Sequence, residues 1–122
     1  MKNKNLKYYS HDVSSHVHWK FKLLRKKYGW EGEGKFWALN NLIAASHECK
    51  LDLTNEDKKE QIAADLDFEK DEFIEFLKYL SDKCKLLKNG DGRYYNEDTQ
   101  ADLSYWEKIR YNDNKRKKDN KL

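Results

Sequence analysis

The sequence predicts a mainly helical domain with a small β-hairpin, and three observations support this fold class. Apolar residues recur at helical spacing in several segments between residues 16 and 112. Proline is absent and the glycines fall in only two places, 29–34 and 90–92, so little interrupts regular structure elsewhere. The segment Asn89–Gly92 reads Asn-Gly-Asp-Gly, a strong hairpin signal. At 122 residues, one hydrophobic core is feasible.

The first two helices are expected on either side of a glycine-rich break. Residues 16–28 form the first, because one apolar stripe joins Val17, Phe21, Leu24 and Tyr28. The glycines of 29–34 supply positive φ or close packing between helices. Residues 35–49 form a second helix that is apolar nearly all round, which predicts a central position. Among the tryptophans, core packing is expected for Trp37 and Trp106 and a more open setting for Trp19 and Trp30.

The second half of the chain predicts one short strand, two helices, a hairpin and a last helix. Residues 50–53 alternate like a minor strand, and Thr54 opens a capping-box pattern for a helix that ends near Leu66. The next helix covers about Glu69–Lys83, with acidic residues on its first turn. The hairpin, the last helix and a polar tail follow, expected at 85–95, 98–112 and 112–122.

This order of elements is that of a winged helix-turn-helix with an extra N-terminal helix, a C-terminal helix and a β-hairpin wing. The region around Asp65–Phe68 would be the turn of the helix-turn-helix pair. A four-helix bundle is the rival, but it leaves the Asn-Gly-Asp-Gly hairpin unexplained. We expect a winged-helix domain over residues 1–111 and a basic disordered tail or linker over 112–122.

Charge is distributed unevenly along the chain. The net charge is +3, yet residues 1–28 and 107–122 are basic while residues 29–106 are acidic. Such an asymmetry is typical of a chain whose ends meet a polyanion. A solvated lysine-rich surface explains the charge equally well.

The opening of the chain resembles a known family. The segments that carry the resemblance are Tyr8-Tyr9-Ser10-His11-Asp12, then Lys22-Leu23-Leu24-Arg25-Lys26-Lys27-Tyr28-Gly29-Trp30-Glu31-Gly32-Glu33-Gly34, then Trp37. They resemble the N-terminal domains of phage and prophage replisome organisers, which are similar to the winged-helix domain of DnaD-like replication initiation proteins. Leu51–Leu53 and Tyr94-Tyr95 are similar to the later strand and hairpin of that family, so the resemblance covers roughly residues 7–110.

The resemblance implies a role in phage or plasmid DNA replication initiation, in which the domain binds DNA, self-associates, or both. From the residues themselves we expect a cytoplasmic protein that is not an enzyme. The family's C-terminal region does not follow Leu122, which fits an isolated N-terminal domain or a short relative. The helix expected at 69–83 carries five acids and three lysines, so phosphates would repel it. Backbone contacts are therefore expected from the first helix, the wing and the tail. The candidate DNA-binding residues are Lys20, Lys22, Arg25, Lys26, Lys27, Lys88, Arg93, Lys115, Arg116, Lys117 and Lys118.

The alternative function is a protein-interaction or oligomerisation module that does not touch DNA. Trp19 and Leu23 form a second, smaller apolar pair on the first helix, and Trp30 lies in the break after it. These three are the candidate partner-binding residues, for self-association or for replication proteins. No segment predicts a secretory signal or a membrane span.

Catalytic and cofactor chemistry finds little support in the sequence. The only candidate metal ligands are His11, Asp12, His16 and His18, and no second acidic cluster joins them at suitable spacing, so we expect structural roles. The glycines of 29–34 match no phosphate-binding loop. Cys49 and Cys84 are expected to be core thiols. We therefore predict no catalytic residue, metal or cofactor.

Overall fold

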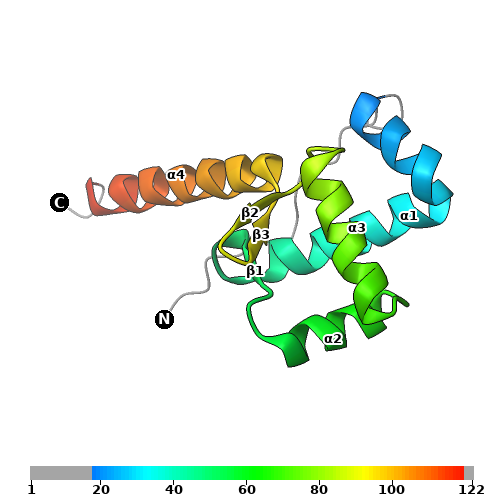
Figure 1. The fold of residues 1–122 in the computed structure, drawn as a ribbon. Helices are drawn as coiled ribbons and strands as arrows, with labels where there is room; N and C mark the ends of the chain where they lie inside the picture. The colour runs from blue at the N-terminus through cyan, green and yellow to red at the C-terminus, as the bar shows by residue number, and fades with distance from the viewer. Residues whose placement is uncertain (1–17, 120–122) are drawn as a thin grey trace.

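The structure, a computed structural model, describes the backbone of residues 18–119 and the side chains of residues 18–111. It is mainly helical, with a small three-stranded antiparallel sheet, which confirms the fold class at that level (Figure 1). In chain order the elements are α1 (Trp19–Ala45), η2 (His47–Cys49), β1 (Leu51–Asp52), α2 (Glu56–Asp65), α3 (Lys70–Asp82), β2 (Lys88–Gly90), β3 (Arg93–Tyr95) and α4 (Glu97–Asp119).

A kink at Gly29 divides α1 into two helical segments. Gly29 has φ 71° and ψ −171°, a conformation that a residue with a Cβ rarely adopts. Trp30–Gly34 is helical, so the predicted break over 29–34 is confined to one residue. The two segments approach so closely that a Cβ on Gly32 would overlap the Cβ of Tyr28. Gly29 therefore supplies positive φ and Gly32 supplies close packing, the two uses that the sequence predicts.

The carboxyl end of α1 is earlier than the sequence predicts. The helix ends at Ala45, and the Ser46 hydroxyl donates to the Leu42 carbonyl at 2.6 Å. Glu48 and Cys49 then adopt positive φ, so the predicted helix over 35–49 is wrong in its last turn. This tight turn delivers the chain directly into β1, where Leu51 is buried.

Asn55, and not Thr54, caps α2. The Asn55 side-chain oxygen accepts from the backbone N–H groups of Asp57 and Lys58 at 2.8 and 3.2 Å. The predicted capping role of Thr54 is wrong because its hydroxyl donates instead to the Asp52 carboxylate at 2.6 Å. The cap therefore lies one residue later, and Asp52 and Thr54 form a turn between β1 and α2.

The predicted inner face of α3 is confirmed. Phe73, Phe76, Leu77 and Leu80 are all buried, and they share the core with α1 and α2. Asp67 has φ 59° and separates α2 from α3. The two helices thus form the close pair that the sequence predicts.

The sheet has the order β1-β3-β2, with every pairing antiparallel. Gly90 pairs with Arg93, so Asp91 and Gly92 form a two-residue turn in which both have positive φ. The predicted strand residues Lys85–Leu87 lie outside β2, because Lys85 has φ 56° and Leu87 turns into the core. The hairpin itself is confirmed.

The last helix, α4, begins one residue before the predicted 98–112 segment and continues to Asp119. Its first turns pack on the body, where Leu103 is buried with Ala44 and Cys49. Trp106 is 47% exposed, so its predicted core position is wrong. Sequence periodicity places Trp106 on the side of Leu103, but the body of the molecule ends before that turn (Figure 1).

Polar groups inside the core have partners. Asn40 on α1 is 1% exposed, and its side-chain oxygen accepts from Asn96 Nδ2 at 3.3 Å. This contact joins the central helix to the residue before α4. It satisfies the requirement for a hydrogen-bond partner that burial imposes on an asparagine.

Candidate nucleic-acid interface

Lysines from the amino half of α1 meet lysines that follow α3. Lys27 Nζ lies 4.4 Å from the ring centre of Tyr79 on α3, and Lys20 Nζ donates to the Lys85 carbonyl at 3.1 Å. Lys83 and Lys85 are exposed at the end of α3 and just after it. We name Lys20, Lys27, Lys83 and Lys85 the basic junction.

Aromatic packing between α1 and α3 creates the basic junction. The ring of Tyr28 meets those of Phe76 and Tyr79 edge to face, at centroid distances of 5.0 and 5.5 Å. The Tyr79 hydroxyl donates to the Leu23 carbonyl at 3.3 Å. The negative end of the α3 dipole lies beside these lysines and favours positive charge there. The fold therefore holds the cations at one place while leaving Lys83 and Lys85 exposed.

Lys22 and Lys26 lie one turn apart on the exposed side of α1. Within the part of the chain whose side chains are described, neither has an ion pair or hydrogen bond through its ammonium group. Both are therefore accessible to a phosphate, which would displace no partner among residues 18–111.

Arg25 faces the kink of α1 rather than solvent. Its Nε lies 3.6 Å from Glu33 Oε2 and donates to the Phe21 carbonyl at 3.3 Å. Its guanidinium also lies 4.5 Å from the ring centre of Trp30. The Arg25 and Glu33 side chains are only 16% and 11% exposed. Arg25 therefore connects the two segments of α1 across the kink, whereas the neighbouring Lys22 and Lys26 are exposed.

The predicted cations of the hairpin each face a carboxylate. Lys88 Nζ lies 3.8 Å from Glu97 Oε1, and Arg93 Nε lies 3.7 Å from Asp52 Oδ2. Hydrogen bonds from Thr54, and then the charge of Arg93, hold the Asp52 pKa below its ordinary value. Exposed pairs of this kind contribute little to stability. A phosphate can therefore compete for Lys88 and Arg93, but it must displace a carboxylate.

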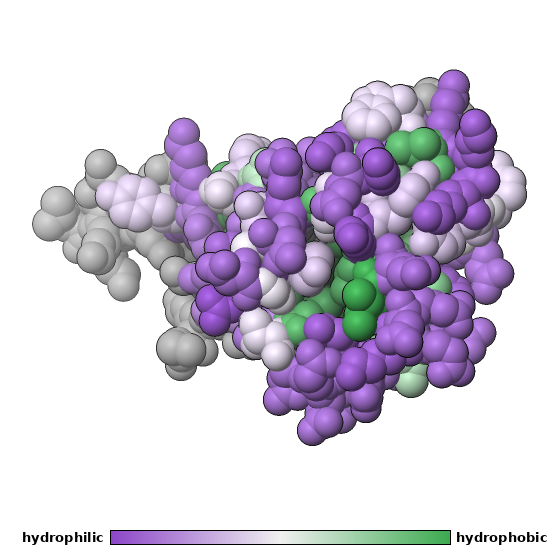
Figure 2. Space-filling view, in the orientation of Figure 1, coloured by the Kyte–Doolittle hydropathy of each residue, from purple (hydrophilic) through white to green (hydrophobic). Residues whose placement is uncertain are grey.

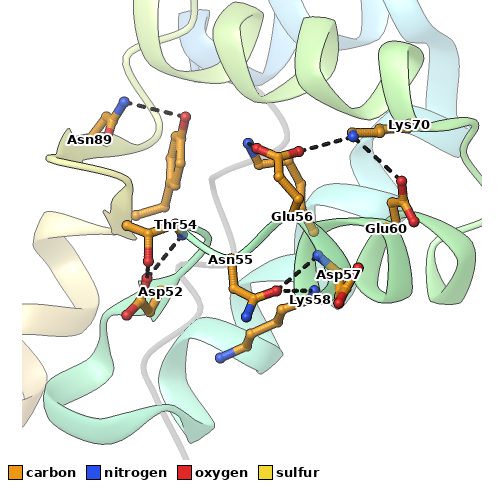
Figure 3. A network of polar contacts seen from close by, with 11 residues as sticks. Asp52, Thr54, Asn55, Glu56, Asp57, Lys58, Glu60, Lys70 and Asn89 are labelled. Carbon is orange, nitrogen blue, oxygen red and sulfur yellow. Dashed lines mark hydrogen bonds and ion pairs between the residues drawn. The ribbon is translucent and has the colours of Figure 1, made fainter.

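The solvent side of α3 is acidic. Asp71, Glu72 and Glu75 are exposed on it. Lys70 is turned toward α2, where its Nζ lies 2.9 Å from Glu56 and 3.4 Å from Glu60 (Figure 3).

The Lys70 contacts shift the ionisation of the groups that they join. Hydrogen bonding to Lys70, followed by that to Lys59, lowers the Glu56 pKa, and Glu56 in turn raises the Lys70 pKa. Because Lys70 is held in this network, it does little to offset the acidic side of α3. That α3 repels phosphate stays a prediction, which the exposed acids Asp71, Glu72 and Glu75 favour.

On one face of the molecule, hydrophilic side chains surround a small apolar area. Figure 2 shows hydrophilic side chains over most of this face, with a hydrophobic area where α2, α3 and the hairpin meet. An open pocket nearby, between α2 and α3, is lined mainly by acids. Its acidic lining residues are Glu60, Asp67, Glu69 and Glu72. Phosphates would therefore be repelled from this pocket.

The predicted contacts of the tail lie on the last turns of α4. Lys115, Arg116, Lys117 and Lys118 belong to the helix, but they lie beyond the residues whose side chains the structure describes. The tail expected at 112–122 is helical as far as Asp119. Its basic residues are thus presented on a helix that continues from the domain.

The three predicted partner-binding residues differ in exposure. Trp19 and Trp30 are 54% and 69% exposed, whereas Leu23 is half-buried against the core. The predicted second apolar face of the first helix is therefore only partly open to a partner, since Leu23 packs against the core of the domain itself.

Lys83 of the basic junction was not predicted from the sequence, because a single lysine at the end of a helix forms no recognisable pattern.

Catalytic candidates are either outside the described residues or engaged in the fold. His11, Asp12 and His16 lie outside them, and His18 caps α1 by accepting from the Lys20 backbone N–H at 3.3 Å. In residues 18–111, no group of three or more His, Cys, Asp or Glu side chains could hold a metal ion.

Both cysteines are buried thiols. Cys49 and Cys84 are each 0% exposed and form no disulfide in the described part of the chain. Burial raises the Cys84 pKa to about 11, although the nearby charge of Lys27 acts in the opposite direction. A thiol with such a pKa is protonated at neutral pH and is a poor nucleophile.

Comparison with family models, with curated proteins and with solved structures finds no match for this chain. Among the described residues, none of the helices combines the length and apolarity needed to cross a bilayer. The function is therefore inferred from the exposed cations of α1 and the basic junction, and from the resemblance in the opening segment.

Proposed function

We propose that the chain is a DNA-binding or replisome-assembly domain of a phage- or plasmid-type replication initiation protein, which contacts mainly the phosphate backbone. The cations exposed on the amino half of α1 and at the basic junction carry this proposal. Lys22 and Lys26 are exposed, and Lys83 and Lys85 extend the positive surface across the end of α3. The resemblance of residues 7–37 to replisome organisers supplies the biological setting.

The proposal includes a winged-helix arrangement. The second segment of α1, then α2 and α3, correspond to its three helices, and the β2–β3 hairpin corresponds to the wing. The third helix of such a domain ordinarily enters the major groove. Here Asp71, Glu72 and Glu75 oppose that mode, which favours an approach through α1 and the hairpin.

A salt titration of duplex DNA binding tests this proposal. For the full chain, the logarithm of the affinity should fall linearly with the logarithm of salt concentration, by about 0.9 per neutralised phosphate. The double substitution Lys22→Ala and Lys26→Ala should lower that slope by roughly 0.9 for each phosphate that these lysines neutralise. No DNA binding at about 50 mM salt contradicts the proposal.

A matched control removes the same charge elsewhere. Lys58 on α2 and Lys78 on α3 are exposed and belong neither to α1 nor to the basic junction. The double substitution Lys58→Ala and Lys78→Ala should leave the slope unchanged. An equal decrease of slope in both double variants would mean that net charge, and not the α1 surface, determines binding.

A protein-interaction module without direct DNA binding is the second candidate. The exposure of Trp19 and Trp30 favours it, because large aromatic side chains are common anchors in protein interfaces. Under this alternative, Trp19→Ser and Trp30→Ser should abolish capture of a replication partner while DNA remains unbound at about 50 mM salt. Intact capture by both variants would exclude these tryptophans as the anchors.

A further inference from the structure

Beyond Leu103, α4 leaves the body of the molecule. Thr99 and Leu103 are buried, and Gln100 Nε2 donates to the carbonyls of Glu48 and Cys49 at 2.7 and 2.9 Å. From residue 104 to 111 each side chain is exposed or half-exposed, and Figure 1 shows the helix extending away from the other helices and the sheet. Residues 104–119 give a projecting length of about 24 Å at 1.5 Å per residue.

One side of the projecting helix is apolar. Tyr105, Trp106 and Ile109 fall within about a quarter to a third of the helix circumference at 100° per residue. Tyr105 and Trp106 are 60% and 47% exposed, and their rings meet edge to face at 5.6 Å. Tyr111 lies on the opposite side. A helix of this length is marginal alone in water and is stabilised by packing of its apolar face.

The charges of α4 separate into two equal and opposite halves. Residues 97–107 contain four acids and no base, a net charge of −4. Residues 108–119 contain six bases and two acids, a net charge of +4. The boundary falls between Glu107 and Lys108, beside the apolar residues. The helix is therefore complementary to a reversed copy of itself.

We propose that the α4 helices of two copies of this chain pair antiparallel, with Tyr105, Trp106 and Ile109 at the centre of the contact. The reversed arrangement places each acidic half beside the partner's basic half, whereas a parallel one opposes like charges. The contact uses the same surface on both copies and closes as a two-fold dimer. A nucleic acid is complementary in charge only to the basic half of α4, whereas a second copy of the chain is complementary to both halves.

This dimer is expected to be weak and dependent on concentration. Centred near residue 107, the two helices overlap over about residues 97–117, roughly 30 Å at 1.5 Å per residue. A contact between two single helices of this length belongs to the small end of specific protein interfaces. The inference rests on α4 alone and not on the proposed function. It is measured without DNA, so failure of either proposal leaves the other intact.

Light scattering of the full chain over a concentration series tests the pairing. The mass should rise from 14.7 kDa toward twice that value as concentration increases from micromolar to millimolar. Ile109→Glu should keep the chain monomeric throughout, while Tyr111→Glu, on the opposite side of α4, should dimerise like the parent. Circular dichroism checks that both variants fold. A parent monomeric at every concentration, or a dimer that Ile109→Glu leaves intact, overturns the proposal.

Disulfide formation between introduced cysteines tests the antiparallel direction. Cys49 and Cys84 are buried, so a new surface cysteine is the accessible thiol. Ile109→Cys lies near the centre of the pair and should form a disulfide-linked dimer under mild oxidation. Asp98→Cys lies on the same side of α4 but about 30 Å from its copy, so it should not. Crosslinking through Asp98→Cys, with none through Ile109→Cys, overturns the antiparallel pairing.

Discussion

Gly32 and Gly34 lie two residues apart on α1, yet the fold requires only the first. A Cβ at Gly32 would overlap Tyr28, whereas nothing lies within 4 Å of a Cβ at Gly34. We expect Gly32→Ala to lower the free energy of unfolding by about 1–3 kcal/mol through overpacking. Gly34→Ala, its matched control, should raise it by about 0.5–1 kcal/mol, because alanine favours the helix. Urea unfolding measures both, and a stabilised Gly32→Ala would show that the kink is not closely packed.

The thiol of Cys84 gives a second prediction at the residue scale. Its pKa is raised to about 11 from an ordinary value of 9.0, so roughly 100-fold less thiolate is present in the folded chain at pH 8. In a Cys49→Ser variant, alkylation by iodoacetamide should therefore be at least about 100-fold slower in buffer than in urea. Mass spectrometry follows the reaction. Equal rates would mean that Cys84 is accessible and ionised.

The same shift determines how stability depends on pH. Between pH 9 and 11 the unfolded chain loses the Cys84 proton while the folded chain retains it. The contribution of Cys84 to stability is therefore complete below pH 9 and decreases as pH rises toward 11. Burial also raises the pKa values of Tyr28, Tyr79 and Tyr94, which acts in the same direction at higher pH.

At the scale of elements, adjacent residues of α1 have different surroundings. Arg25 contacts Glu33 and Trp30 across the kink, while Lys26 faces solvent. We expect Arg25→Met to lower the free energy of unfolding by roughly 1–3 kcal/mol, because Glu33 would then be mostly buried without its cation. Lys26→Met should leave stability nearly unchanged and weaken DNA binding. Urea unfolding and a DNA-binding titration are measured for each variant. If Lys26→Met lowered stability and Arg25→Met only weakened DNA binding, the roles given to the two residues would be wrong.

The limits of sequence reasoning are also clearest at the scale of elements. Apolar spacing is sufficient to place the inner face of α3, and Asp91-Gly92 is sufficient to place the hairpin turn. The sequence does not predict that Trp30–Gly34 is helical. Three glycines in six residues indicate a break over the whole segment, whereas only Gly29 is non-helical. The capping pattern favours Thr54 as the cap of α2. A local pattern does not show that the Thr54 hydroxyl donates to the Asp52 carboxylate instead.

The candidate site is less predictable from the sequence than the fold. Composition alone identifies the basic residues of α1, but spacing cannot show that Arg25 faces the kink. The basic junction depends on a tertiary contact between Lys20 and the Lys85 carbonyl, which a local pattern does not contain. The core position predicted for Trp106 is wrong because periodicity gives a helix face but not how far the neighbouring body extends.

For the whole molecule, the uneven charge predicts which parts contribute to DNA binding. Residues 112–122 contain five bases and two acids. Deletion of residues 112–122 should reduce the salt slope of DNA binding by up to about 0.9 for each basic residue that contacts a phosphate. The same deletion should leave the unfolding midpoint of the domain nearly unchanged, because the core ends at Leu103. An unchanged salt slope would restrict the DNA surface to α1 and the hairpin.

The order β1-β3-β2 has a consequence for synthesis of the chain. The central strand, β3, is the last of the three to be made, and Leu51 pairs with Tyr94 across more than forty residues. Neither β1 nor β2 has a strand to pair with until Tyr95 has left the ribosome. The helices α1, α2 and α3 can pack beforehand, since all three precede β2 and β3 in the chain. A nascent chain stalled before residue 93 would therefore display helices without the sheet, and its release would complete the domain in one late step.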